Sequence, residues 1–266
     1  MAPFIDETIQ SVIGQDYPNV ECIVIDGGSD DSTLDILKRY ENRIKWVSEK
    51  DKGQSDAINK GIALATGDIL TYLNADDSIE PGCLKKVADY FSKNTAVMWL
   101  YGKCLIVNGD GKVIRRPISW YKSFWQKRYT YSWLLIMDFI SQPTVFWRSQ
   151  LTEEIGLFDI TEHLAMDYDY WLRAGAKYRP GYIDSYLARF RLHSVSKSST
   201  SFGTAAKAAL KIGREQAILQ RRWYVLPFQY LTLFLVVGTY SILLVFIRLR
   251  RMNNHMNDGL RTASKA

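Results

Sequence analysis

Two adjacent carboxylates follow an apolar stretch early in the chain. The run Leu70–Leu73 has the length of a strand, and Asn74, Ala75, Asp76 and Asp77 come directly after it. Such runs are typical of buried strands in α/β sheets, whose ligands bind at the carboxyl ends of the strands. The two carboxylates repel each other unless a cation neutralises them, and oxygen ligands favour Mg²⁺ or Mn²⁺ carrying substrate phosphates. The alternative is an Asx-type turn without a ligand.

A second acidic position lies about 90 residues further along the chain. Asp167 and Asp169 open a segment in which Trp171 and Leu172 can face the interior of a helix. A carboxylate at this place can accept a proton from a substrate hydroxyl. The alternative is an N-terminal carboxylate that only stabilises the helix dipole.

Alternating strands and helices are expected to position these carboxylates. Three strand–helix alternations in the first 80 residues predict parallel βαβ units with right-handed crossovers. The predicted strands here are Val20–Asp26, Ile44–Ser48 and Asp68–Leu73. Later, residues 97–107 and 112–115 flank an Asn-Gly-Asp-Gly turn typical of a hairpin, and Tyr186–Leu192 predicts another strand.

Composition narrows the class of protein. The 266 residues suffice for one large domain or two small ones, with a net charge of +6 and three widely spaced cysteines. Much of the basic charge lies in the last third, so we expect no nucleic-acid partner. The chain shows no leader, no zinc spacing and no disulfide framework, which favours a reducing environment. The aromatic stretch 117–147 is interpreted as core, the alternative being a sugar- or lipid-facing surface.

The C-terminal region differs in kind. Residues 225–247 carry no charge over a length that could cross a bilayer, and arginines flank them on both sides. We therefore predict a transmembrane helix there, following an amphipathic linker helix over 201–224 and preceding a basic tail over 248–266. The expected localisation is the cell membrane, with the catalytic domain of residues 1–200 in the cytoplasm.

Four motifs in a fixed order resemble those of a known family. They are Asp26–Thr33 (DGGSDDST), Ser48–Gly61, Leu73–Asp77 (LNADD) and Met166–Arg173 (MDYDYWLR). Together they resemble the family 2 glycosyltransferases, which are inverting enzymes of the GT-A fold, over residues 1–200. The resemblance implies an α/β fold with a mixed sheet and helices on both faces, to which the predicted C-terminal transmembrane helix is added.

The resemblance also implies roles for individual residues. Asp167 matches the general base. Asp76 and Asp77 match the metal-binding region, with Asn74 where many relatives have Asp, and His193 sits near the expected diphosphate and metal. The residues implied to bind the nucleotide-sugar are Asp26, Gly27, Ser29, Asp51, Asp56, Asn59 and Asp76.

The start of the chain departs from the family pattern. The family begins with a strand that ends in part of the nucleotide pocket, whereas residues 1–12 resemble the helix after that strand. A central strand and part of the base-binding loop are therefore expected to be missing. This expectation leaves two functions open: a full enzyme, or a non-catalytic, membrane-anchored remnant that binds nucleotide-sugar.

The favoured function is an inverting glycosyltransferase of cell-envelope or exopolysaccharide synthesis. It would move a sugar from a UDP- or dTDP-sugar to a lipid-linked or polysaccharide acceptor, with Mn²⁺ or Mg²⁺ as cofactor. An inverting transfer needs one carboxylate as base and charge compensation for the departing diphosphate. The two separate acidic positions fit these two tasks.

Overall fold

A computed structural model describes residues 1–193 and 202–234 of the chain. The first half contains α1 (Ala2–Ile13), β1 (Ile23–Asp26), α2 (Thr33–Lys38), β2 (Lys45–Ser48), α3 (Gln54–Leu64), β3 (Ile69–Leu70), β4 (Ser78–Ile79), α4 (Cys83–Lys93), β5 (Trp99–Val107) and β6 (Val113–Ile114). The second half contains α5 (Arg116–Gln126), α6 (Tyr131–Ile136), η1 (Gln142–Thr144), β7 (Phe146–Arg148), α7 (Ser149–Ile155), α8 (Met166–Lys177), β8 (Gly181–Arg191), α10 (Phe202–Leu219) and η2 (Trp223–Val225).

The strands form two separate sheets. The larger sheet has the order β3-β7-β5-β8-β4, and β6 pairs with β5 as the predicted hairpin. It is mixed, because β5 and β8 run parallel whereas the other pairs are antiparallel. The smaller sheet contains only β1 and β2, paired in parallel from Ile23 opposite Lys45 to Asp26 opposite Ser48. In the described part of the chain, no strand joins the two sheets.

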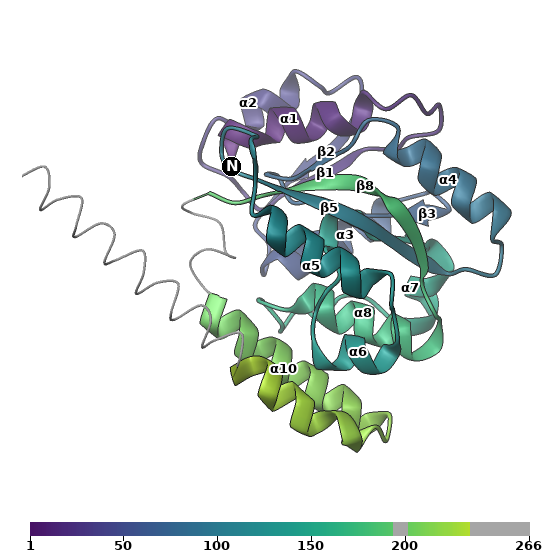
Figure 1. Cartoon of the computed structure of the whole chain (residues 1–266). Coiled ribbons are helices and arrows are strands. Elements are labelled where there is room, and N and C mark those ends of the chain that lie inside the picture. Colours follow the sequence, from purple (N-terminus) through teal and green to yellow (C-terminus); the bar gives the residue numbers. More distant parts are fainter. Residues whose placement is uncertain (194–201, 235–266) are drawn as a thin grey trace, which may run out of the picture.

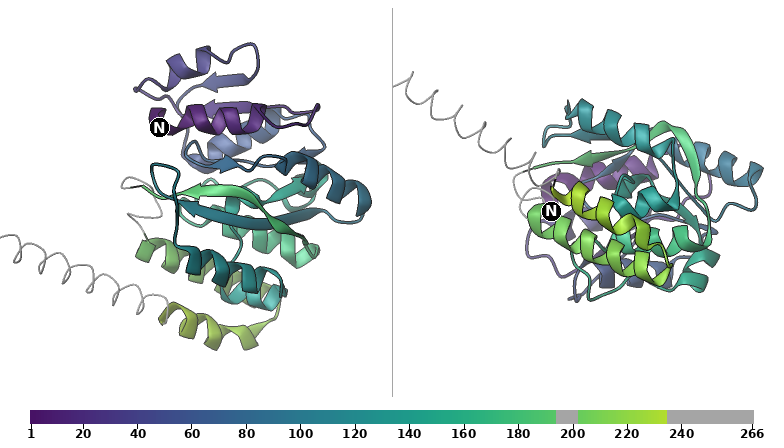
Figure 2. Two further views of the ribbon diagram at one scale, coloured as in Figure 1. Left: turned by 45° about the horizontal axis from the view of Figure 1, so that its top comes forward. Right: turned by 60° about the horizontal axis from the view of Figure 1, so that its bottom comes forward.

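Helices enclose the sheets in layers. Figure 2 (left) shows α1 and the small sheet on one side of the larger sheet, with α5, α6 and α10 on the other. The α1 helix packs Ile5 and Ile9 against Leu37 and Ile44, at the ends of the neighbouring βα units. The predicted α/β fold with a mixed sheet and helices on both faces is therefore confirmed.

The main core is aromatic and lies between the larger sheet and α8. Trp99 stacks on Trp171 with 6.0 Å between ring centroids, and Phe158 stacks on Tyr170 at 4.2 Å. These rings are buried, and such aromatic pairs contribute beyond the area that they bury. The aromatic stretch 117–147 only partly joins this core, because Trp120 is 75% exposed on α5.

The structure corrects the predicted transmembrane helix. Over residues 1–193 and 202–234, no helix combines the length and the apolar character needed to cross a membrane. Val225 and Gln229, at the start of the predicted span, are buried in the globular domain, and Gln229 Nε2 donates to Leu135 O at 2.7 Å. A transmembrane helix beginning at Val225 is therefore wrong, and the membrane localisation that rested on it loses its basis. Residues 235–247 and the tail 248–266 lie outside the described residues.

Candidate active site

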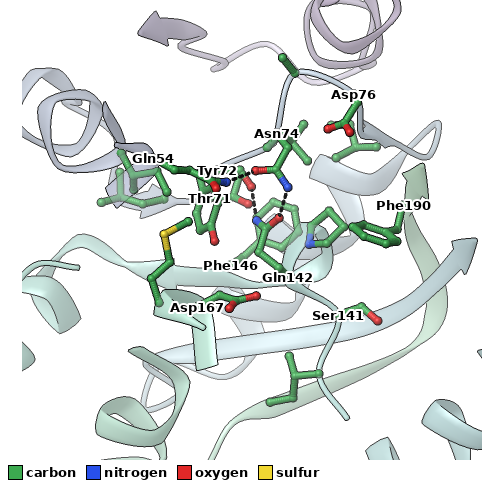
Figure 3. Close-up of a pocket in the computed structure, with 18 of the residues that line it drawn as sticks. Gln54, Thr71, Tyr72, Asn74, Asp76, Ser141, Gln142, Phe146, Asp167 and Phe190 are labelled. Atoms are coloured by element: carbon green, nitrogen blue, oxygen red, sulfur yellow. Dashed lines mark hydrogen bonds between the residues drawn. The ribbon is translucent and has the colours of Figure 1, made fainter. Parts of the chain in front are cut away.

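A cleft of about 2180 Å³ runs between the small sheet, the larger sheet and the N-terminus of α8. It collects the ends of β1 and β3 and the first turn of α8, although these elements are far apart in sequence. Figure 3 shows Asn74 and Asp76 on one side of this cleft and Asp167 on the other. The predicted site residues that line it are Asp26, Gly27, Ser29, Asp51, Asp76 and Asp167.

Asp26 organises the loop that follows β1. Its carboxylate accepts hydrogen bonds from Gly28 N at 3.1 Å, Ser29 N at 2.9 Å and the hydroxyls of Ser29 and Ser48. Burial raises the pKa of Asp26, but these four donors outweigh burial and hold the pKa below its ordinary value. The carboxylate is therefore ionised and fixed, and it shapes the Gly27–Ser29 loop at the edge of the cleft.

Gly27 allows the next loop to approach closely. A Cβ at Gly27 would overlap with the carboxylate of Asp51, so only glycine leaves this position open. Asp51 in turn accepts a hydrogen bond from Gly53 N at 2.9 Å, and Gly53 has a φ of 117° that favours glycine. The two loops after β1 and β2 thus meet at one corner of the cleft.

Two of the predicted nucleotide-binding residues lie on α3 but do not line the cleft. Asp56 accepts from Lys52 N at 3.1 Å and pairs with Lys60, so it stabilises the start of the helix. Asn59 binds Phe158 through both backbone groups, at 2.8 and 3.0 Å, and so ties α3 to the loop after α7. Both side chains therefore stabilise the fold around α3.

Amides connect the carboxyl end of β3 to η1. Asn74 Oδ1 accepts a hydrogen bond from Gln54 Nε2, and Asn74 Nδ2 donates to Gln142 Oε1 at 3.3 Å. Gln142 Nε2 donates to Tyr72 O at 2.7 Å (Figure 3). The sequence analysis did not select Gln54 or Gln142, since only the fold brings them to Asn74.

Asp76 faces the cleft and is joined to His193. The carboxylate Oδ2 lies 2.9 Å from His193 Nε2, and the two side chains are only 10% and 8% exposed. Phe4 of α1 covers the imidazole, with 4.7 Å between the ring centroids. The structure therefore brings together two of the three predicted metal ligands, which are 117 residues apart.

Asp77, the third predicted metal ligand, points into the protein. Its carboxylate accepts from Arg191 N at 2.9 Å and from Asn74 Nδ2 at 3.1 Å, and the residue is 1% exposed. Burial, together with the neighbouring Asp76 charge, raises the pKa of Asp77 to about 8. Protonation of Asp77 thus relieves the repulsion between the adjacent carboxylates. The sequence analysis had expected a metal ion to relieve it.

Arg191 holds the Asp76–Asp77 turn in place. Its guanidinium is almost fully buried and donates to Asp76 O at 3.0 Å, Asn108 O at 3.2 Å and Gly109 O at 2.9 Å. It also pairs with Glu7 of α1 at 2.6 Å. One side chain therefore connects α1, the acidic turn and the β5–β6 hairpin.

Asp167 lies in the first turn of α8 and faces the cleft. Its Oδ1 accepts from Tyr168 N at 2.9 Å. Burial raises the pKa of Asp167, whereas this N–H and the cation of Lys122 lower it, and burial wins. The helix N-terminus also favours the ionised form, but burial prevails, so the pKa is raised, and the hydrogen bond from Tyr168 N fixes the orientation of the carboxylate.

Asp138 and Lys122 also line the cleft and were missed by the sequence analysis. The Asp138 side chain is exposed to the cleft, and desolvation by the surrounding protein, together with the charge of Asp167, raises its pKa to about 7. Lys122 opposes that shift. The only signal in the sequence was a lone Asp between Met137 and Phe139, which is indistinguishable from an ordinary loop residue.

The sequence of the chain is similar to known glycosyltransferases. A family model described as "Glycosyl transferase family 2" matches residues 2–156. The chain belongs to glycosyl transferase family 2. An uncharacterized glycosyltransferase of Haemophilus influenzae is 31% identical over 80% of this chain and 68% of its own length. A PGL/p-HBAD biosynthesis glycosyltransferase of Mycobacterium bovis is 28% identical over 76% of this chain and 74% of its own.

Solved structures agree with the GT-A fold of this family 2 chain. A mannosyltransferase from Pyrobaculum calidifontis with GDP-Man and Mn²⁺ aligns with a TM-score of 0.61 at 17% identity, covering 92% of this chain and 77% of that one. S. aureus TarS in complex with UDP aligns with a TM-score of 0.59 at 20% identity, covering 79% of this chain and 62% of that one. This chain thus spans less than two thirds of that TarS structure. The predicted class, a family 2 glycosyltransferase, is confirmed.

The family implies a divalent metal, and the donor set can be tested against that expectation. The described residues contain no group of three or more His, Cys, Asp or Glu side chains that could hold an ion. They do contain the paired Asp76 and His193 at the cleft. A divalent ion that carries substrate phosphates needs only one or two protein ligands, so this pair fits such an ion.

Proposed function

We propose that this family 2 enzyme transfers a sugar from a UDP- or dTDP-sugar to a hydroxyl of a lipid-linked or polysaccharide acceptor, with inversion at the anomeric carbon. The observation that carries the proposal is the placement of Asp167 across one cleft from Asn74 and Asp76 (Figure 3). The two acidic positions are thus separated by the space that a donor sugar would occupy.

Asp167 is the proposed general base. In a single displacement, the acceptor oxygen forms a bond to the anomeric carbon while the bond from that carbon to the diphosphate oxygen breaks. The acceptor hydroxyl gives its proton to the Asp167 carboxylate, and no covalent intermediate with the enzyme is needed. The hydrogen bond from Tyr168 N fixes one carboxylate oxygen, and the raised pKa makes the group a stronger base.

Asp76 and His193 are the proposed ligands of Mn²⁺ or Mg²⁺. When bound, the ion would neutralise the negative charge of the nucleoside diphosphate. Arg191 and Asp77 position these ligands from behind, through the Asp76 carbonyl and the backbone of β8. The Mn²⁺ in the structure of the Pyrobaculum calidifontis mannosyltransferase supports a divalent metal as cofactor.

The loops after β1 and β2 are the proposed nucleotide site. Asp26 and Asp51 fix the two loops at the corner of the cleft, which Gly27 and Ser29 line. The UDP and UDP-GlcNAc complexes of TarS support a uridine donor.

The decisive experiment compares Asp167→Asn with Asp169→Asn. Asp169 lies in the same helical turn, pairs with Arg173 at 2.9 Å and does not line the cleft. We expect Asp167→Asn to bind UDP like the wild type and to lower turnover by about 10²–10⁴-fold, the usual contribution of a general base. Asp169→Asn should keep its turnover, and NMR of the product should show the inverted anomeric configuration.

Three results would count against the proposal. Equal turnover of the two variants would reduce Asp167 to a helix-stabilising residue. Retention of the anomeric configuration would exclude the single displacement. Binding of UDP-sugar by the wild type without any turnover, across acceptors of both classes, would favour a binding protein.

A further inference from the structure

A second cavity, a groove of about 730 Å³, lies beside α5 and shares no lining residue with the active-site cleft. Its walls come from α5, which packs along β5 (Figure 1), and from β5, β6 and Tyr186 of β8. We propose that this groove is a second carbohydrate site, which binds a linear glycan carrying carboxylate or phosphate groups. The proposal rests on the glycosyltransferase family of the chain and on no step of the proposed reaction.

The α5 helix separates the groove from the active-site cleft. The helical residues that line the groove recur at intervals of three and four, and they are Arg116, Ser119, Trp120, Ser123, Phe124 and Lys127. Such spacing places them in one stripe along the helix. Ile118, Tyr121 and Lys122 lie on another face and line the active-site cleft. The groove and the cleft are therefore separate sites on two faces of one helix.

The groove is rich in cations. Over residues 112–128 the sequence has six Lys and Arg side chains and no Asp or Glu. The four cations that line the groove are Lys103, Arg116, Lys127 and Arg128. Among the described residues, Asp184 is the one carboxylate that pairs with any of them, binding Lys103 and, at 2.7 Å, Lys127. The two arginines have no carboxylate partner in this part of the chain, so they can bind an anionic ligand.

Exposed aromatic rings lie beside these cations. Trp120 is 75% exposed, Tyr186 42% and Phe124 41%. The guanidinium carbon of Arg128 lies 3.9 Å from the centroid of the Phe124 ring, and Lys103 Nζ lies 5.7 Å from that of Tyr186. Large apolar groups gathered on a surface mark an interaction site. The flat faces of these rings suit the apolar C–H faces of sugar rings.

An unsatisfied hydroxyl lies in the wall of the groove. Ser119 is 8% exposed, and its Oγ has no hydrogen-bond partner among the described residues. A buried polar group normally has such a partner. One turn further on, Ser123 Oγ donates to Ser119 O at 2.8 Å and can still accept a hydrogen bond. A ligand rich in hydroxyl groups would supply these missing partners.

These features together define the occupant. The free arginines require an anion, the exposed rings require flat apolar faces, and the serines require hydroxyl groups, all of which an anionic glycan offers. The stripe from Arg116 to Lys127 is about 16 Å long, which accommodates several linked sugars. A single-stranded nucleic acid also combines anions with stacking rings, but a family that transfers sugars favours a glycan. A flat lipid surface does not fill a groove.

Fluorescein-labelled oligogalacturonate, a linear chain of carboxylated sugars, tests the inference on the full 266-residue chain. We expect saturable binding by fluorescence anisotropy that weakens as salt is added, because salt screens exposed charges. The methyl ester of the oligomer keeps the rings and loses the charges, and it should bind about fivefold more weakly. Polyglutamate with as many carboxylates keeps the charges and loses the rings, and it should also bind about fivefold more weakly. Saturating UDP with Mn²⁺ should leave the Kd of the oligomer unchanged.

Paired variants locate the site. Trp120→Ala removes the most exposed ring of the groove and should weaken binding by about three- to tenfold. Its control, Trp223→Ala, removes a ring that is 62% exposed on η2 outside the groove, and it should bind the oligomer like the wild type. Arg116→Gln should weaken binding by about two- to fivefold. Lys85→Gln, at an exposed position of α4, should leave the affinity unchanged.

Several results would overturn the inference. Absence of saturable binding, or equal affinities of the Trp120→Ala and Trp223→Ala variants, would exclude the groove as a glycan site. Equal affinity for polyglutamate would reduce the groove to a nonspecific basic patch. Competition by UDP would place the oligomer in the active-site cleft. Tighter binding of oligo-dT or of phosphatidylglycerol vesicles than of oligogalacturonate would identify a nucleic acid or a lipid as the ligand.

Discussion

Replacement of Arg191 by Met tests how the acidic turn is held in place. The guanidinium donates to three backbone carbonyls, those of Asp76, Asn108 and Gly109, and pairs with Glu7. Met has a similar apolar stem but no donors. The variant therefore removes these bonds with little change in the volume of the buried side chain.

The expected cost follows from what each partner loses. Asp76 is 8% exposed, so its carbonyl would be left unsatisfied in the interior, at about 1–3 kcal/mol. Gly109 lies exposed at the hairpin turn and Asn108 is partly exposed, so water can replace the guanidinium there. Glu7 is 51% exposed, and its ion pair contributes at most about 1 kcal/mol. We expect Arg191→Met to lower the free energy of unfolding by about 1–4 kcal/mol.

Urea denaturation followed by circular dichroism measures this loss. The matched control is Arg189→Met on the same strand, because Arg189 is 39% exposed and, among the described residues, forms an ion pair only with Glu80. The control should change the free energy of unfolding by less than about 1 kcal/mol. Since Arg191 also fixes the Asp76 backbone, the Met variant should lose affinity for UDP in the presence of Mn²⁺. If both variants unfold at the same urea concentration, Arg191 does not support the acidic turn as argued.

Three further predictions address the site. Asp76→Asn should abolish the Mn²⁺-dependent part of UDP binding in calorimetry, and unchanged affinity would remove Asp76 from the metal site. Gly27→Ala should displace the Asp51 carboxylate and weaken UDP binding by about tenfold, with the far-UV circular dichroism spectrum unchanged. The raised pKa of Asp138, about 7, means that the native state keeps a proton that the unfolded chain releases, so this group makes stability fall as pH rises from about 4 to 7. Asp138→Asn should flatten that part of the Tm-against-pH curve, and an unaltered slope would contradict the assignment.

The sequence predicted those parts of the fold that depend on local patterns. The strand–helix alternation, the hairpin around Asn108–Gly111 and the acidic ends of β1 and β3 all have local signatures. The order of the motifs also placed Asp167 correctly in the first turn of a helix. Each of these features is set by residues within a few positions of one another.

The parts that could not be predicted depend on partners far apart in the chain. Arg191 reaches the Asp77 carboxylate across 114 residues, and no local pattern shows that this backbone N–H supports a buried carboxyl group. Asn59 has the polarity of a ligand-binding residue, but its amide satisfies the backbone of Phe158, 99 residues away. The residue type alone therefore did not distinguish residues that line the cleft from residues that support it.

The transmembrane helix predicted from hydropathy at the C-terminal region was wrong for a related reason. An uncharged apolar helix looks the same in sequence whether it crosses a bilayer or packs on a protein surface. Here the start of the segment packs against α6, where Gln229 is buried through its hydrogen bond to Leu135 O. The polar Gln229 was a sign of that contact, because a buried amide needs a partner.

The division of the strands into two sheets also divides the tryptophans. Trp99, Trp147 and Trp171 are fully buried in the core of the larger sheet, whereas Trp46 of β2 is the single tryptophan among residues 1–98. The other four, Trp120, Trp125, Trp133 and Trp223, lie in α5, α6 and η2, so intrinsic fluorescence of this protein reports mainly on the larger sheet and the helical segments α5, α6 and η2. The difference between the emission of the wild type and that of Trp46→Phe isolates the signal of the small sheet, so opening of β1 and β2 can be followed optically on its own.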